Sequence, residues 1–115
     1  ESNVGIETLA EMQAEGKIRS FGASVKTIAG GLRASTLCDV VMVSMSPGVR
    51  SFVPVVEAAF NAGKGVLVKK PFDSGHYPEP VRALTELNKE PGITSIIFGS
   101  INPKHLKANC EALKT

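Results

Sequence analysis

Apolar residues along the chain follow two alternating patterns. Short runs rich in valine and isoleucine, bounded by glycine, proline or charged residues, are typical of buried parallel strands. Between these runs, apolar residues recur every three or four positions, as on one face of a helix. The predicted strands span residues 17–24, 39–45, 65–70 and 93–98, and the predicted helices span residues 3–15, 27–34, 52–62, 80–89 and 102–113.

The order of these elements predicts an α/β fold. Strands that are separated by helices pair in parallel through right-handed crossovers, which gives either a small doubly wound sheet or part of a (β/α)₈ barrel. No strand precedes the first helix, so we expect the natural folding unit to begin earlier. Four strands cannot close a barrel, and a lone half exposes two sheet edges. Residues 1–115 are therefore predicted to form a single partial domain.

Helix ends are marked by capping residues. Asn3, Thr27 and Ser51 are predicted to cap the first three helices, because their side chains can accept a hydrogen bond from a free backbone N–H. Gly30 and Gly31 should weaken the second helix by about 1 kcal/mol each relative to alanine.

The last predicted strand and helix form a candidate anion site. Gly99 permits a sharp turn after the strand, Asn102 is a good N-cap, and Pro103 suits the first helical position. Apolar residues 106, 110 and 113 then share a helical face. A helix that starts beside the end of a strand presents backbone N–H groups to a crevice, which favours phosphate.

Two basic residues follow directly in the first turn of this helix. Lys104 and His105 oppose the helix dipole by about 0.3–1 kcal/mol each. An anion bound there would explain them. The alternative, which the sequence leaves open, is that both are solvated surface residues.

Composition excludes several classes of protein. The chain has 13 basic and 11 acidic residues. The basic residues are scattered, so a nucleic-acid-binding face is not supported. No apolar run approaches the roughly 20 residues that span a bilayer, and no signal peptide is visible. Cys38 and Cys110 lack the spacing of metal ligands and lie on apolar patterns, so we expect two buried thiols in a reducing, cytoplasmic environment.

Three segments resemble the C-terminal half of an aldo/keto reductase, a member of a family of NAD(P)-dependent oxidoreductases built on a (β/α)₈ barrel. The segments are AEGKIRSFGAS at residues 14–24, GVLVKKPF at residues 65–72, and PGITSIIFG at residues 91–99 with Asn102-Pro103 and residues 106–109 after it. They resemble, in order, the family's strand-five, strand-seven and strand-eight regions. The resemblance covers almost the whole chain and implies that its strands are numbers five to eight.

The resemblance also implies NADP or NAD as cofactor. The matching positions are Ser24, Lys70, Pro71, Phe72, Gly99, Ser100, Asn102, His105 and Asn109. By this match, Ser24 binds the nicotinamide carboxamide, residues 70–72 hold the pyrophosphate, and residues 99–109 bind the adenosine end. Phosphate sites in such barrels commonly lie in the loops after strands seven and eight.

Lys69 is a further candidate, because it stands with Lys70 at the carboxyl end of an apolar strand, where ligands approach both barrels and open sheets. Several positions depart from the family pattern. Val25 replaces an asparagine, Met42 a glutamine, and Lys69 an aromatic residue that stacks on the nicotinamide. Gly99 and His105 replace the lysine and arginine of NADP-preferring members, which leaves the choice between NAD and NADP open.

The family's catalytic Asp, Tyr, Lys and His belong to the earlier half of the barrel, and those motifs are absent here. The only tyrosine, Tyr77, lies beside His76 in a proline-flanked loop and is interpreted as a loop residue. We therefore predict the cofactor-binding part of an enzyme that reduces a small carbonyl substrate when joined to the N-terminal half of the barrel. The alternative hypothesis is a non-catalytic, self-associating half-barrel that binds a nucleotide or phosphate.

Overall fold

Four parallel strands form a single sheet in the computed structural model, which describes residues 4–114. The strands are β1 (Gly22–Ser24), β2 (Val40–Ser44), β3 (Gly65–Lys69) and β4 (Ser95–Ile96), and the sheet order β1-β2-β3-β4 follows the chain. The helices are α1 (Val4–Ala14), α2 (Ile28–Leu37), α3 (Val53–Asn61), α4 (Pro80–Leu87) and α5 (Pro103–Ala112), with a short 3₁₀ helix η1 (Asp73–Gly75). The predicted α/β class is confirmed, and each predicted helix and strand has a counterpart.

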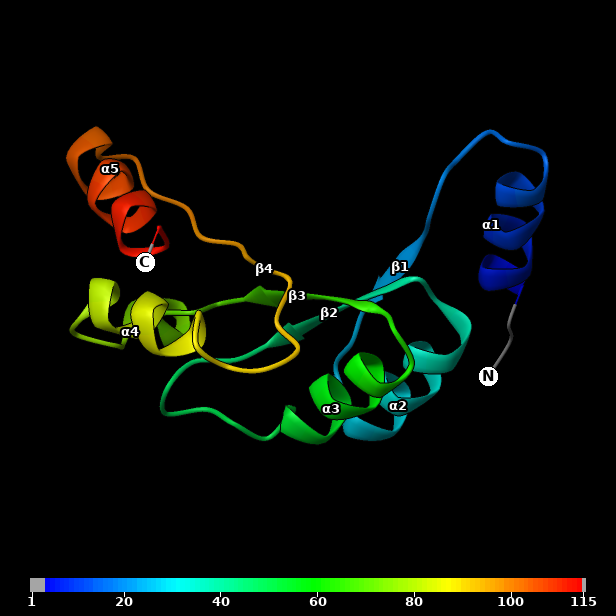
Figure 1. Cartoon of the computed structure of the whole chain (residues 1–115), viewed down its shortest axis with the longest axis horizontal. Coiled ribbons are helices and arrows are strands. Elements are labelled where there is room, and N and C mark those ends of the chain that lie inside the picture. Colours follow the sequence, from blue (N-terminus) through cyan, green and yellow to red (C-terminus); the bar gives the residue numbers. More distant parts are fainter. Residues whose placement is uncertain (1–3, 115) are drawn as a thin grey trace.

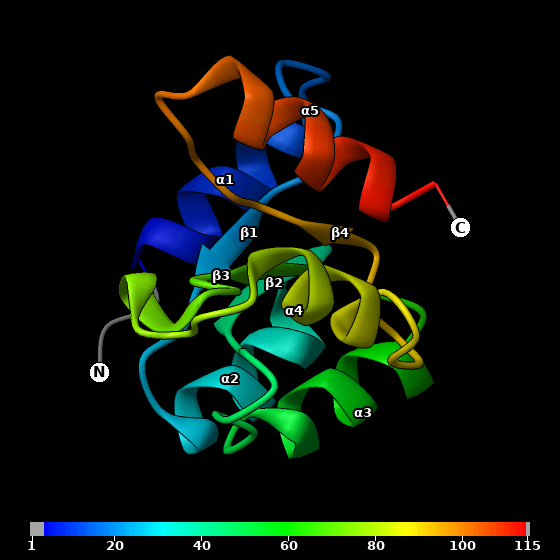
Figure 2. The ribbon, with the colours of Figure 1, turned by 90° about the vertical axis from the view of Figure 1, so that its left-hand side faces the viewer.

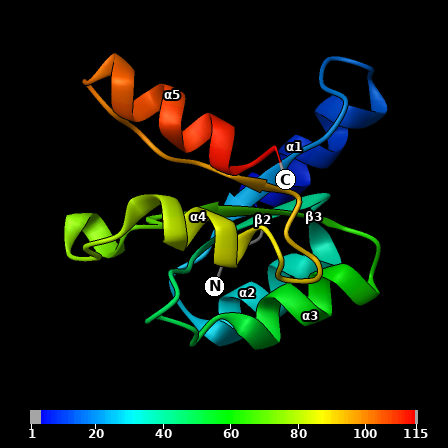
Figure 3. The ribbon, with the colours of Figure 1, turned by 60° about the vertical axis from the view of Figure 1, so that its left-hand side comes forward.

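The hydrophobic core lies on one side of the sheet. Helices α2 and α3 cover this side, as Figures 1 and 3 show. The residues of the core are Val25, Ala34, Cys38, Val41, Val43, Met45, Val55, Val56, Ala59, Val66, Val68 and Leu87. In β2 and β3, every second residue is buried against these helices because side chains alternate between the faces of a strand.

The opposite face of the sheet is open in its middle. Helices α1 and α5 both lie on this side of the sheet (Figure 2), above opposite ends of it (Figure 1). Val40, Met42 and Leu67 point to this face and are only half-buried. Within residues 4–114, the strands that were predicted to be buried are therefore covered on one face only. The radius of gyration is 15.3 Å, whereas a compact domain of about this size has a radius of about 13 Å.

Close packing of α2 against α3 depends on a glycine. A Cβ atom added at Gly31 would lie 2.6 Å from Cγ2 of Val55. Gly31 thus lowers the helix propensity of α2 but allows α2 and α3 to approach each other closely. At the start of the same helix, the hydroxyl of Thr27 accepts a hydrogen bond from the backbone of Gly30, which confirms the predicted cap.

Both outer strands are shorter than predicted. Strand β1 begins at Gly22, because the backbone N–H of Phe21 donates to the side chain of Asp39 instead of to a neighbouring strand. Strand β4 has two residues, and just before it the hydroxyl of Thr94 accepts a hydrogen bond from the backbone of Val66. Each of these strands pairs on one side only, and both side-chain hydrogen bonds lie on that paired side, between β1 and the entry to β2 and between β3 and the entry to β4.

Three local predictions are wrong. Helix α3 is preceded by Phe52 at the N-cap position and has no side-chain cap from Ser51. Phe60, which continues the apolar pattern of the predicted helix at residues 52–62, is 59% exposed. Cys110 is exposed, and Asn109 is the buried residue of α5 instead. The predicted cap Asn3 lies outside the described residues.

Candidate functional site

The carboxyl ends of the parallel strands meet at one edge of the sheet. In the strand register, Ser24 pairs with Met42, Met42 with Leu67, and Ser44 with Lys69. Paired residues in parallel strands share a face. Ser24 and Lys69 therefore lie on the open face, at the edge where the sequence predicted cofactor contacts.

A hydrogen bond joins these two predicted site residues. Nζ of Lys69 donates to Oγ of Ser24 at 2.6 Å. Strand β2 lies between β1 and β3, so the lysine side chain crosses in front of its carboxyl end. Of the ion pairs found among residues 4–114, none includes Lys69 or Lys70. The edge thus carries positive charge that no carboxylate of the described chain neutralises by direct contact.

The loop after β3 has an unusual backbone. Lys70, Asp73 and Ser74 all have left-handed conformations, with φ of 55°, 50° and 55°. Such conformations are uncommon for residues other than glycine, and they persist only where surrounding contacts enforce them. The loop is closed by a hydrogen bond from the backbone N–H of Tyr77 to the carbonyl of Phe72, at 2.9 Å.

Pro71 and Phe72 anchor this loop to the body of the protein. Pro71 is buried and Phe72 is half-buried. The rings of Phe72 and Phe98 are 6.2 Å apart between centroids, a tilted aromatic contact between the loop and the segment after β4. Lys70, by contrast, is exposed. The loop is therefore held in place while its lysine stays available to a ligand.

A cavity of about 400 Å³ lies between α4, α5 and the segment after β4. Its lining residues are Phe72, Pro80, Val81, Gly99, Ser100, His105, Ala108 and Asn109. Five of these were predicted as site residues. Pro80, Val81 and Ala108 were not, although Ala108 follows His105 by three residues and hence shares its helical face.

Asn109 is the most buried residue of α5, at 5% exposure. Within residues 4–114, no hydrogen bond of its side-chain amide to another residue is found. An amide with both donor and acceptor groups, held in a cavity without a protein partner, is suited to a ligand that offers complementary polar atoms.

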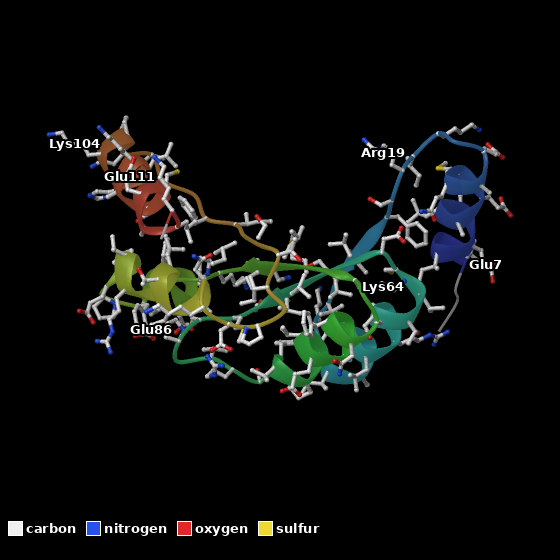
Figure 4. All side chains as sticks on the ribbon, viewed as in Figure 1. Glu7, Arg19, Lys64, Glu86, Lys104 and Glu111 are labelled. Atoms are coloured by element: carbon white, nitrogen blue, oxygen red, sulfur yellow. The ribbon has the colours of Figure 1, made fainter. Side chains whose placement is uncertain are left out.

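The start of α5 is capped by the protein itself. Oδ1 of Asn102 accepts a hydrogen bond from the backbone N–H of Lys104 at 2.9 Å, and Oγ of Ser100 accepts one from the backbone N–H of Asn102 at 3.1 Å. Lys104 points away from the molecule (Figure 4), and neither it nor Asn102 lines the cavity. His105 is therefore the residue of the first helical turn that can contact a ligand in this cavity.

The open face carries a second hollow, of about 310 Å³. Its lining residues are Ser20, Phe21, Gly22, Ala23, Ser24, Val40, Met42 and Leu67. Most of this surface is apolar, and it extends toward the amino ends of β1 and β2. Ser24 is the only predicted site residue in it. Neither hollow is lined by Tyr77 or His76.

No helix of the described residues is both long and apolar enough to cross a membrane. No protein-family model and no curated protein matches the chain.

Solved structures do match it. One is a crystal structure of a Pseudomonas aeruginosa protein assigned to the aldo-keto reductases, with 39% identity and a TM-score of 0.84 over 93% of this chain. A second structure from that organism, with the same assignment, shows 38% identity and a TM-score of 0.80 over 94% of this chain. The chain spans 41% and 44% of the length of these structures.

The sheet and its helices thus form half of a (β/α)₈ barrel, with the candidate site at the carboxyl edge of the strands. In sequence and fold the chain is similar to about two fifths of these aldo/keto reductase structures, which is consistent with the C-terminal half of such a barrel.

Proposed function

We propose that this chain is the cofactor-binding part of an NAD(P)-dependent aldo/keto reductase that reduces small aldehydes or ketones. The observation that carries the proposal is the cavity beside α5. It is lined by five residues that the sequence predicts as site residues, Phe72, Gly99, Ser100, His105 and Asn109. Its size and its mixture of aromatic, hydroxyl, imidazole and amide groups fit the adenosine end of a dinucleotide.

The other candidate site residues lie where the pyrophosphate and the nicotinamide of the cofactor would bind. Lys70 projects from a loop anchored by Pro71 and Phe72, beside the cavity, where an exposed ammonium group can bind the pyrophosphate. Ser24 lies on the open face, where its hydroxyl can bind the nicotinamide carboxamide. Lys69, hydrogen-bonded to Ser24, belongs to the same end of the site.

The chemistry divides between the two halves of the barrel. When bound, the cofactor supplies the hydride. This chain orients the cofactor, while a carbonyl oxygen also needs a proton donor, which the earlier half of the barrel would provide. We therefore expect the chain by itself to be inactive. Both cysteines are free, which is compatible with a reducing environment, and we place the complete protein in the cytoplasm.

Fluorescence titration of the complete protein with NADH and NADPH tests the proposal. Saturable binding of either cofactor is expected, and the tighter of the two settles the cofactor preference. The purified chain should show no carbonyl reductase turnover in the same assay mixture. Failure of the complete protein to bind either cofactor would contradict cofactor binding, and turnover by the chain alone would contradict its predicted inactivity.

A second candidate function is favoured by the open face. The apolar hollow that includes Phe21, Met42 and Leu67, together with the free edges of β1 and β4, suits association with another copy of the chain. Size-exclusion chromatography separates the possibilities. A discrete dimer that binds nucleotide would support this candidate, whereas proton-donating Tyr and Lys residues in an adjoining N-terminal half would contradict it.

A further inference from the structure

The side chain of Lys69 places a positive charge at the carboxyl edge of the sheet. Nζ of Lys69 lies 2.6 Å from Oγ of Ser24, on the open face of the sheet. A hydroxyl neutralises no charge. The ion pairs found within residues 4–114 leave this ammonium group without a carboxylate. Whatever group Ser24 binds is therefore placed next to a full positive charge.

The two forms of a nicotinamide cofactor respond differently to such a charge. The oxidised nicotinamide ring carries a positive charge, the reduced ring is neutral, and the pyrophosphate and adenosine parts are the same in both. A nearby cation therefore repels the oxidised ring and leaves the reduced ring almost unaffected.

We propose that Lys69 is a specificity-determining residue that makes the site bind the reduced cofactor in preference to the oxidised one. This inference rests on the proposed function, because it requires the nicotinamide to lie at Ser24. It also predicts the favoured direction of the reaction, because a site that releases the oxidised cofactor readily is suited to carbonyl reduction more than to alcohol oxidation.

The geometry explains why Lys69 can act in this way and Lys70 cannot. Lys69 is the last residue of β3 and shares the open face with Leu67, two residues earlier. Lys70 follows in a left-handed conformation, with φ of 55°, and is exposed in the loop. A charge on Lys70 that meets the pyrophosphate acts equally on both forms of the cofactor. The neighbouring lysine is therefore a matched control.

The test measures the dissociation constants of the oxidised and reduced cofactor separately, by calorimetry on the complete protein. In Lys69→Met, the ratio of the oxidised to the reduced constant should fall by about tenfold, mainly through tighter binding of the oxidised form. Lys69→Arg, which keeps the charge, should retain most of the wild-type ratio. Lys70→Gln should weaken both forms by a similar factor and leave the ratio unchanged.

The dependence of this ratio on ionic strength gives a second test. Because salt screens a partly exposed charge, the wild-type ratio should fall as salt concentration rises, and the ratio in Lys69→Met should respond much less. Binding of both forms with the same ratio in wild type and Lys69→Met would overturn this inference and leave the proposed function intact. Binding of neither form to the wild-type protein would overturn both.

Discussion

Asp39 holds the start of β1 in place through its side chain. Its Oδ2 accepts a hydrogen bond from the backbone N–H of Phe21 at 3.0 Å, across 18 residues of sequence. The same oxygen accepts a second hydrogen bond from Nε2 of Gln13 in α1, at 3.1 Å. One carboxylate oxygen thus connects the first helix, the entry to β1 and the entry to β2.

Replacement of Asp39 should therefore destabilise the fold. Asp39→Ala leaves the N–H of Phe21 without its acceptor and should lower the free energy of unfolding by about 1–3 kcal/mol, as measured by urea denaturation. Asp39→Asn retains an oxygen acceptor and should lose clearly less. Equal stability of the alanine variant and the wild type would show that water replaces this hydrogen bond at no cost.

Gly31 and Gly5 should respond in opposite ways to alanine. Helix propensity favours alanine over glycine, by about 1 kcal/mol in a helix interior such as the position of Gly31. In Gly31→Ala, however, the new Cβ meets Val55 at 2.6 Å, so we expect a net loss of about 1–3 kcal/mol from overpacking. At Gly5 nothing lies within 4 Å of a new Cβ, and a gain is expected. Thermal unfolding of both variants tests this, and a gain in Gly31→Ala would mean that α2 and α3 can move apart freely.

His105→Ala should weaken cofactor binding, because the imidazole lines the cavity beside α5. Loss of one side-chain interaction with the adenosine end should raise the dissociation constant by about fivefold to tenfold. Lys107→Ala is a suitable control, because Lys107 lies on the same helix and is exposed outside the cavity lining. An unchanged constant in His105→Ala would contradict the assignment of the adenosine end to this cavity.

The two cysteines should differ in reactivity. Cys38 is 1% exposed. Burial raises the pKa of its thiol, the charge of Asp39 raises it further, and Lys64 opposes these effects. The thiol therefore stays protonated at pH 8, where its thiolate would otherwise begin to form, and we expect it to resist iodoacetamide until the protein unfolds. Cys110 is exposed and should be alkylated in the folded protein, as mass spectrometry of the peptides can establish.

The order and type of the elements could be predicted from local features. Runs of β-branched residues determine β2 and β3, and the caps at Thr27 and Asn102 mark the starts of α2 and α5. Burial could not be predicted in the same way. Cys110 and Phe60 continue apolar helical patterns but are exposed, because burial depends on which neighbouring surface each face meets.

Only part of the candidate site could be predicted from the sequence. Glycine, cap and basic residues near α5 indicated a ligand site, and the family resemblance named Asn109 and Ser24. The hydrogen bond between Ser24 and Lys69 joins residues 45 positions apart, across an intervening strand. Nothing in the local pattern around either residue indicates it, since it follows from the strand register.

The sheet order has a consequence for how the chain folds. Each strand pairs with the strand that comes next in the sequence, β1 with β2, β2 with β3, and β3 with β4. Pairings between sequence neighbours close short loops, so each β/α unit can add to the preceding one soon after synthesis. Only the contact of β4 with the first strand of a closed barrel would join distant parts of the chain. We therefore expect barrel closure to be the slow step in folding of the complete protein. The four strands of this half should be assembled before that step.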